Sequence, residues 1–111
     1  MERFDLRSAE VEPHQPVVLH SEPEGRSILL ALPAGERLQE HQVHERAWVL
    51  VVEGEIEIEH GAQTFTGGPG LLAIFDPNEP HEVRATTDTR LFLVLAPWPG
   101  VGHPDHEATE R

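Results

Sequence analysis

The pattern of apolar and polar positions along this chain predicts many short strands and little helix. Residues 55–59 (EIEIE) alternate strictly, which places Ile56 and Ile58 on one face and the glutamates on a wet face. Residues 47–52 (AWVLVV) and 71–75 (LLAIF) are apolar on both faces and too short for a typical helix, so they should be strands buried on both sides. No segment keeps a 3.6-residue apolar stripe.

Turn residues separate these runs at short intervals. Glu53-Gly54 is interpreted as a hairpin corner, and residues 60–63 as the next turn. Further extended segments are expected at 4–7, 17–20, 27–32, 37–43, 64–66, 82–85 and 90–96. The pattern predicts an all-β barrel or sandwich, with an extended arm over 1–26, the barrel over 27–96 and a loose tail over 97–111.

Composition narrows the chemistry. A chain of 111 residues corresponds to about one small domain. Its net charge of −12 argues against nucleic acid and anionic membranes as partners. The chain has no cysteine, lysine or tyrosine, which excludes thiol nucleophiles, Schiff bases and phosphate-loop lysines. The acidic start lacks an apolar stretch, so we expect no secretory signal and a cytoplasmic protein.

Eight histidines are many for so short a chain, and histidine is the commonest neutral metal ligand. His41 and His81 each lie beside a nearly continuous apolar strand, so their rings could meet inside one barrel. His103 and His106 have ligand-like spacing but lie in the tail, where adventitious metal binding is the simpler interpretation.

Two stretches, GERLQEHQVHERAWVLVVEG (35–54) and GLLAIFDPNEPH (70–81), resemble the two motifs of the cupin superfamily. The first keeps its glycines and first histidine in register, and the second keeps its glycine, proline and histidine. The matching residues are Gly35, His41, Gly54, Gly70, Pro77 and His81, with Asn78 at a usual glycine. The resemblance implies a double-stranded β-helix, or jelly-roll barrel, of antiparallel strands.

The first motif departs from the family at two ligand positions. Val43 stands at the second histidine and Ala47 at the glutamate, while His44 lies one residue beyond the expected place. The resemblance implies a divalent transition metal (Zn, Fe, Ni, Mn or Cu) on His41 and His81. His44 is a third candidate ligand if a bulge breaks the strand alternation, with Glu40 and Glu45 as weaker ones.

Apolar residues at the usual ligand positions favour a small organic ligand in a pocket lined by Val43, Ala47 and Val49. One interpretation is metal-assisted chemistry of a dioxygenase or isomerase type. The alternative is a binding or sensing cupin with a degenerate, metal-free site, and a purely structural dimerisation unit is a third possibility. Whether the protein is an enzyme stays open at this point.

The strand at 47–52 also bears on assembly. If Ala47 and Val49 face the interior, Trp48, Leu50 and Val52 form an apolar strip on the outside. A second subunit would cover that strip, so we expect a homodimer.

Overall fold

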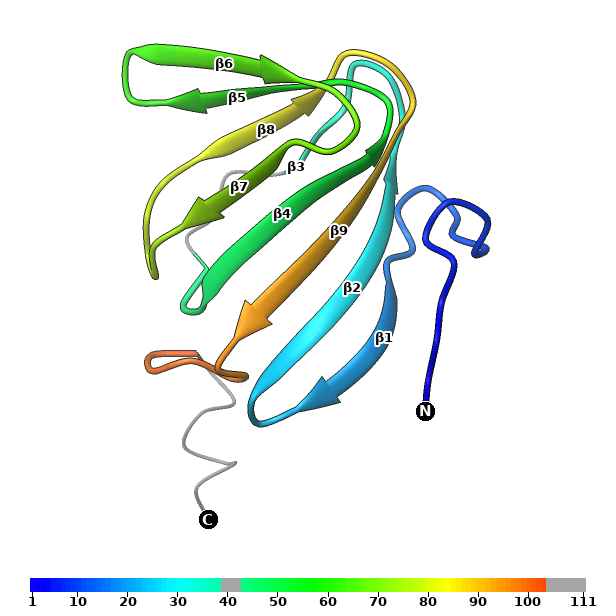
Figure 1. The fold of residues 1–111 in the computed structure, drawn as a ribbon. Helices are drawn as coiled ribbons and strands as arrows, with labels where there is room; N and C mark the ends of the chain where they lie inside the picture. The colour runs from blue at the N-terminus through cyan, green and yellow to red at the C-terminus, as the bar shows by residue number, and fades with distance from the viewer. Residues whose placement is uncertain (39–42, 104–111) are drawn as a thin grey trace.

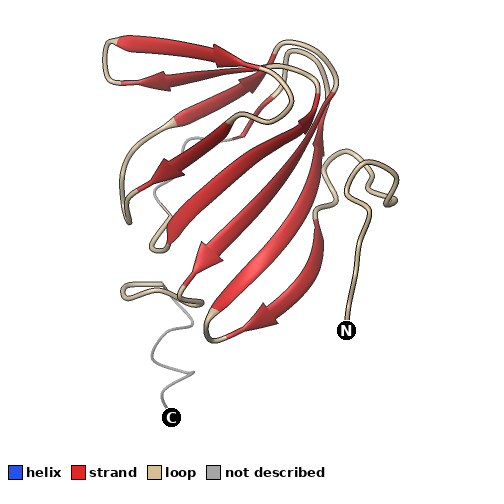
Figure 2. Cartoon of the chain, in the orientation of Figure 1, coloured by secondary structure: helices blue, strands red, loops and turns tan. Residues whose placement is uncertain are grey.

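The structure is a computed structural model, and it describes residues 1–38 and 43–103. Strands account for the regular structure of the described residues, which contain no helix (Figures 1 and 2). The strands are β1 (Val17–Glu22), β2 (Gly25–Leu32), β3 (Arg37–Leu38), β4 (Arg46–Glu53), β5 (Ile56–His60), β6 (Gln63–Gly67), β7 (Leu72–Phe75), β8 (Glu82–Ala85) and β9 (Thr89–Ala96). The predicted all-β class is confirmed.

The strands form two antiparallel sheets. One has five strands in the order β1-β2-β9-β4-β7, and the other has four in the order β3-β8-β5-β6. Neighbours in each sheet are mostly remote in sequence, as in a jelly roll. The chain therefore crosses repeatedly between the sheets, which brings the segments before β4 and after β7 to one end (Figure 1).

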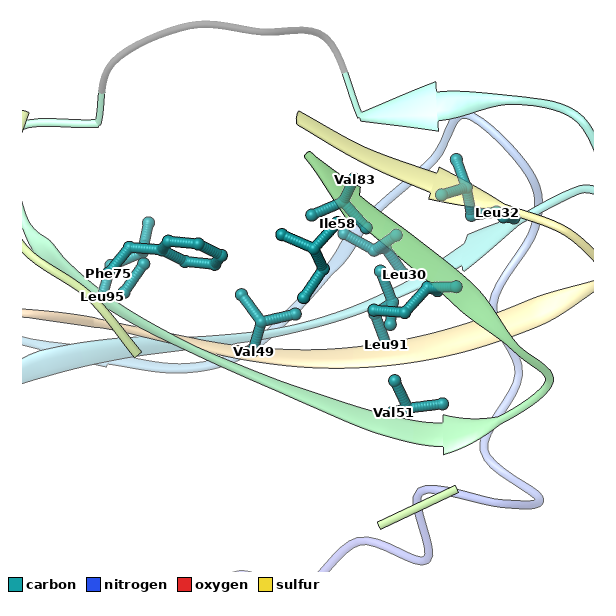
Figure 3. Packing of buried hydrophobic residues seen from close by; sticks show 12 residues of the cluster. Leu30, Leu32, Val49, Val51, Ile58, Phe75, Val83, Leu91 and Leu95 are labelled. Atoms are coloured by element: carbon teal, nitrogen blue, oxygen red, sulfur yellow. The ribbon is translucent and has the colours of Figure 1, made fainter. Parts of the chain in front are cut away.

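One hydrophobic core lies between the inner faces of the sheets. Val49, Val51 and Leu91 enter it from the five-stranded sheet, and Ile58 and Val83 from the other (Figure 3). Each of the five is at most 5% exposed. Burying such a side chain contributes about 1.5–3 kcal/mol before chain entropy is counted. The alternation predicted for 55–59 is confirmed by these positions. The prediction that 47–52 and 71–75 are buried on both sides is wrong, because alternate residues of β4 are only partly buried and Leu72 and Ile74 of β7 are 51% and 53% exposed.

The segment at Glu53-Gly54 differs from the prediction. It is not a hairpin corner, because β4 pairs with β7 and β9 while β5 pairs with β6 and β8. It carries the chain from one sheet to the other. Gly54 has φ +90°, and a Cβ there would clash with the carbonyl oxygen of Asp88, so a residue without a side chain is required. The predicted turn over 60–63 does join a hairpin, β5 to β6.

The N-terminal arm is also less extended than expected. Residues 4–7 do not form an extended segment, because Asp5 accepts hydrogen bonds from the backbone of Arg7 and Ala9 and folds the chain into a turn. The guanidinium of Arg90 donates to the carbonyls of Leu6 and Ala9, at 3.1 and 2.6 Å, and holds the turn against β9. Residues 17–22 of the expected arm form β1, which pairs with β2.

The described residues include no helix with the length and apolar character needed to cross a membrane.

Candidate functional site

The ends of the two motif stretches lie together in the structure. Strands β4 and β7 are antiparallel neighbours, with Ala47 opposite Phe75, so the segment before β4 lies beside the segment after β7. Two hydrogen bonds join them. The backbone N–H of Asn78 donates to the carbonyl of Val43 (2.7 Å), and the Asn78 side-chain oxygen lies 3.0 Å from His44 Nδ1.

Asn78 explains how the second motif works without its usual glycine. Its φ is +63°, in the left-handed region that asparagine tolerates best among residues with a side chain. The amide then makes a contact that glycine could not make, because its oxygen pairs with the His44 ring. The substitution keeps the turn and adds a link between the motifs.

His81 lies against the hydrophobic core. Its ring stacks on Phe75, with ring centroids 3.8 Å apart and planes 9° apart, and Phe75 is 5% exposed. His81 Nδ1 is 3.0 Å from the carbonyl oxygen of Glu79. Since a carbonyl oxygen can only accept, Nδ1 carries the proton in this contact, and Nε2 is the nitrogen left to act as an acceptor or ligand. This is the ring orientation that a carbonyl partner imposes on a metal-binding histidine.

His44 faces a different neighbour. Its ring meets the ring of His103 edge to face, with centroids 6.0 Å apart, and Gly102 packs directly against it. None of the contacts described for His44 involves His81. Within residues 1–38 and 43–103, no three His, Asp or Glu side chains are grouped so that they could hold a metal ion.

Two further candidate ligands, Glu40 and His41, and the tail histidine His106 fall outside the described residues. Glu40 and His41 belong to residues 39–42, so the predicted meeting of His41 with His81 stays a prediction. The tail histidine His106 belongs to residues 104–111 and is likewise outside.

The predicted pocket residues point to the interior. Ala47 and Val49 are each 2% exposed and belong to the core, and Val43 is partly buried and packs against the core.

His81 borders a hollow of about 310 Å³, which is lined by Glu59, Gly61, Pro80, His81 and Glu82. A cleft of about 660 Å³ opens elsewhere, between the arm and β2 and β3. Its lining includes His14, Leu30, Leu32, Arg37, Leu38 and Glu82.

The contacts of residues 98–103 were not foreseen from the sequence. Glu45 is 1% exposed, and its carboxylate accepts a 2.7 Å hydrogen bond from the backbone of Gly100. Trp98 packs on the core. The guanidinium carbon of Arg26 lies 4.1 Å from the centre of the Trp98 ring, and the Trp98 and His103 ring centroids are 4.7 Å apart. In the sequence, the signal that could have indicated these contacts is a tryptophan and a glycine within an otherwise polar tail. A Cβ at Gly100 would lie 2.6 Å from the His44 carbonyl oxygen.

Charged side chains surround the site. Arg46 and Asp76 form an ion pair at the ends of β4 and β7. The carboxylate of Glu79 accepts from the backbone of Asp76 (2.8 Å) and pairs with His60. These contacts hold the loop that carries Asn78 and His81 at its first residue, Asp76, and at Glu79.

The architecture matches known double-stranded β-helices. A Klebsiella pneumoniae protein described as having a double-stranded beta-helix domain aligns with a TM-score of 0.76 and 19% identity, over 90% of this chain and 94% of that chain. The cupin domain of Schizosaccharomyces pombe Cnp3 aligns with a TM-score of 0.74 and 19% identity, over 86% of this chain and 73% of that chain. At these identities the likeness shows the fold alone.

The sequence comparison identifies the family. The cupin domain family model matches residues 28–97, so this chain belongs to the cupin family. A curated relative, the polyketide synthase CurC of Streptomyces cyaneus, is 34% identical in an alignment of 88 residues that covers 72% of this chain. The chain spans 56% of the length of that relative.

Proposed function

We propose that this cupin binds a small organic ligand at the mouth formed by the two motif segments, together with a divalent transition metal held through His81. The observation that carries the proposal is the ring of His81, which is stacked on Phe75 and oriented by the Glu79 carbonyl so that Nε2 is its acceptor. His41 and His44 are the proposed further ligands. The metal is Zn, Fe, Ni, Mn or Cu, all of which accept imidazole nitrogen.

The relation to CurC supports a class of ligand. We propose a polyketide-like molecule, which carries several carbonyl groups on an apolar framework. A bound metal would polarise such a carbonyl and lower the cost of enolisation. Two groups of this chain would complete the site: Val43, which is partly exposed and packs against the core, would present an apolar side chain to the framework, and the Phe75 ring keeps His81 in place.

A second candidate function is binding or sensing without a metal. It is supported by Val43 and Ala47, which put apolar groups where the family has ligands. In that case His81 would offer a hydrogen-bond acceptor to the ligand. For either function we propose a cytoplasmic homodimer, since a chain without cysteine needs no oxidising compartment.

Metal content separates the two candidates. Native-sequence protein is loaded with each metal, dialysed and measured by elemental analysis. The metal proposal predicts about one ion per chain for one of the metals, falling below about a tenth in His81→Ala. His14→Ala is the matched control, because its side chain is 71% exposed and lies on the arm, and it should keep the metal.

Each other outcome is decisive. Wild-type content below about a tenth per chain would refute the metal and leave the second candidate. Retention of metal by His81→Ala would refute the assignment of His81.

Ligand binding is followed by NMR, with a carbonyl-rich aromatic polyketide as probe. We expect shifts at the methyl groups of Val43 and Ala47, and unchanged spectra would refute the pocket.

A further inference from the structure

The cleft between the arm, β2 and β3 has the size and the apolar floor of a small-molecule site. Its volume of about 660 Å³ falls within the roughly 300–1,000 Å³ that such sites occupy. Leu30 and Leu32 of β2 and Leu38 of β3 line it. Leu30 and Leu32 lie at the end of the core opposite Phe75, the residue on which His81 stacks (Figure 3). The cleft is therefore separate from the mouth formed by the two motif segments.

The N-terminal arm forms one wall of the cleft with residues 14–16. Two contacts fasten this wall to the barrel. Pro13 forms a parallel bridge with Ala31 of β2, and His14 Nε2 lies 3.3 Å from a carboxylate oxygen of Glu36. His14 has φ +65°, in the left-handed region that residues with a side chain seldom adopt. The wall lies outside residues 28–97, which the family model matches.

The wall that carries Glu36 is held by its backbone. The carbonyl of Glu36 accepts a hydrogen bond from the N–H of Ala85 in β8 (2.9 Å), and the N–H of Glu36 donates to the carbonyl of Pro33 (3.0 Å). Both walls are thus fixed by contacts within the chain. A ligand that enters the cleft would lose little free energy to ordering them.

The charges along the cleft favour a cation. Among the described residues that line it, Glu36 and Glu82 carry carboxylates and Arg37 carries a guanidinium. Arg37 donates to Glu82, whereas the contact of Glu36 is with the imidazole of His14, and the Glu36 side chain is 40% exposed. The net charge of −12 adds to the negative potential that a cation meets on approach.

We propose that this cleft binds a small organic amine. The apolar body of the amine lies on Leu30, Leu32 and Leu38, and its protonated nitrogen donates to the carboxylate of Glu36. The inference goes beyond the proposed function and does not rest on its metal, its ligand or its homodimer.

Three probes with the same indole body test the sign of the charge. Tryptamine is a cation at neutral pH, indolepropionate is an anion and tryptophol is neutral. Calorimetric titration of the full chain should show tryptamine binding about tenfold more tightly than the other two, because charge-assisted hydrogen bonds are about twice as strong as neutral ones. Absence of tryptamine binding, or equal binding of indolepropionate, would refute the amine.

Methyl NMR locates the bound probe. Tryptamine should shift the methyl signals of Leu30, Leu32 and Leu38, which line the cleft. Shifts confined to other methyl groups would show that tryptamine binds elsewhere and would refute the cleft.

Two glutamate variants of similar exposure test the contact with the amine. Glu36→Gln should weaken tryptamine binding about tenfold, because it removes the carboxylate and keeps the size of the side chain. Glu57→Gln is the control, since Glu57 is 35% exposed on β5 and does not line the cleft, and it should bind tryptamine as the wild type does. Equal affinities of wild type and Glu36→Gln, or equal losses in both variants, would refute the role of Glu36.

Arg37→Gln gives a second test if circular dichroism shows that Glu36→Gln does not fold. It removes the cation paired with Glu82 and should strengthen tryptamine binding. Weaker or unchanged binding in Arg37→Gln would refute the electrostatic argument.

His81→Ala separates this site from the proposed function. His81 does not line the cleft, so this variant should bind tryptamine as the wild type does, even where it has lost metal. Loss of tryptamine binding in His81→Ala would refute a separate site, whereas a wild type without metal that still binds tryptamine would refute only the metal.

Discussion

The outer faces of the two sheets differ in chemistry although the same chain forms both. On the four-stranded sheet the outer face is charged, with Arg84 near Glu57 (3.9 Å) and Arg37 paired with Glu82 (2.5 Å). On the five-stranded sheet the outer face is apolar, as at Trp48. Strict alternation therefore marks a sheet that faces water, and its loss in β4 marks a sheet with apolar groups on both sides.

The largest effect is expected inside the four-stranded sheet, where the two faces differ most. Ile58→Ala removes a core side chain that is 5% exposed and should lower the free energy of unfolding by about 3 kcal/mol. Glu57→Ala, one residue away on the outer face, should change it by less than about 0.5 kcal/mol. Urea denaturation at one protein concentration measures both, since any association between copies would make stability depend on concentration.

Equal losses in these two variants would contradict the assignment of a wet face to β5. Val49→Ala and Leu50→Ala provide the same comparison on β4. There the substitution of the outward residue, Leu50, should also lower the free energy of unfolding, because the outer face of that sheet is apolar.

The next effect concerns Gly54, which joins the two sheets. Gly54→Ala forces a residue with a side chain into the left-handed region and against the Asp88 carbonyl. It should lower the free energy of unfolding by up to about 3 kcal/mol. Gly61→Ala is the control, with φ +62° but no atom within 4 Å of the new Cβ, and it should cost about 1 kcal/mol. Thermal unfolding compares them, and a Gly61 variant as unstable as the Gly54 variant would show that the close contact is unimportant.

The smallest effect concerns pH at the arm of the five-stranded sheet. His20 Nδ1 donates a hydrogen bond to the carboxylate of Glu2, which raises the pKa of His20 above 6.5, and neighbouring acidic charges add to it. Because the folded pKa is raised, this contact stabilises the arm fully below pH 6.5, and the contribution is lost as pH rises through the raised pKa. NMR titration should show a lower His20 pKa in Glu2→Gln, whereas an unchanged pKa would exclude Glu2 as the cause.

Much of the fold could be predicted because it depends on local pattern. The inward positions of Ile56, Ile58 and Val83 follow from a period of two and the core confirms them. The connection at Gly54 could not be predicted from local pattern. A glycine turn has the same sequence signature whether the next strand pairs with the preceding strand or crosses to the other sheet. Strand pairing depends on contacts remote in sequence.

The site was less predictable for the same reason. The resemblance implied that the two motif segments meet in one barrel, and the structure places the His44 and Asn78 segments side by side. The stacking of His81 on Phe75 and the contact of Glu45 with Gly100 depend on side-chain packing that no spacing encodes. Whether His41 joins His81 stays a prediction, because His41 lies outside the described residues.

The position of His103 decides where a purification tag belongs. Its ring faces His44, and only eight residues follow it in the sequence. Eight residues span at most about 28 Å, so a polyhistidine tag at the C-terminal end could reach the motif segments and deliver nickel from the column. A cleavable tag before Met1, which is fully exposed, avoids mistaking that nickel for a native cofactor.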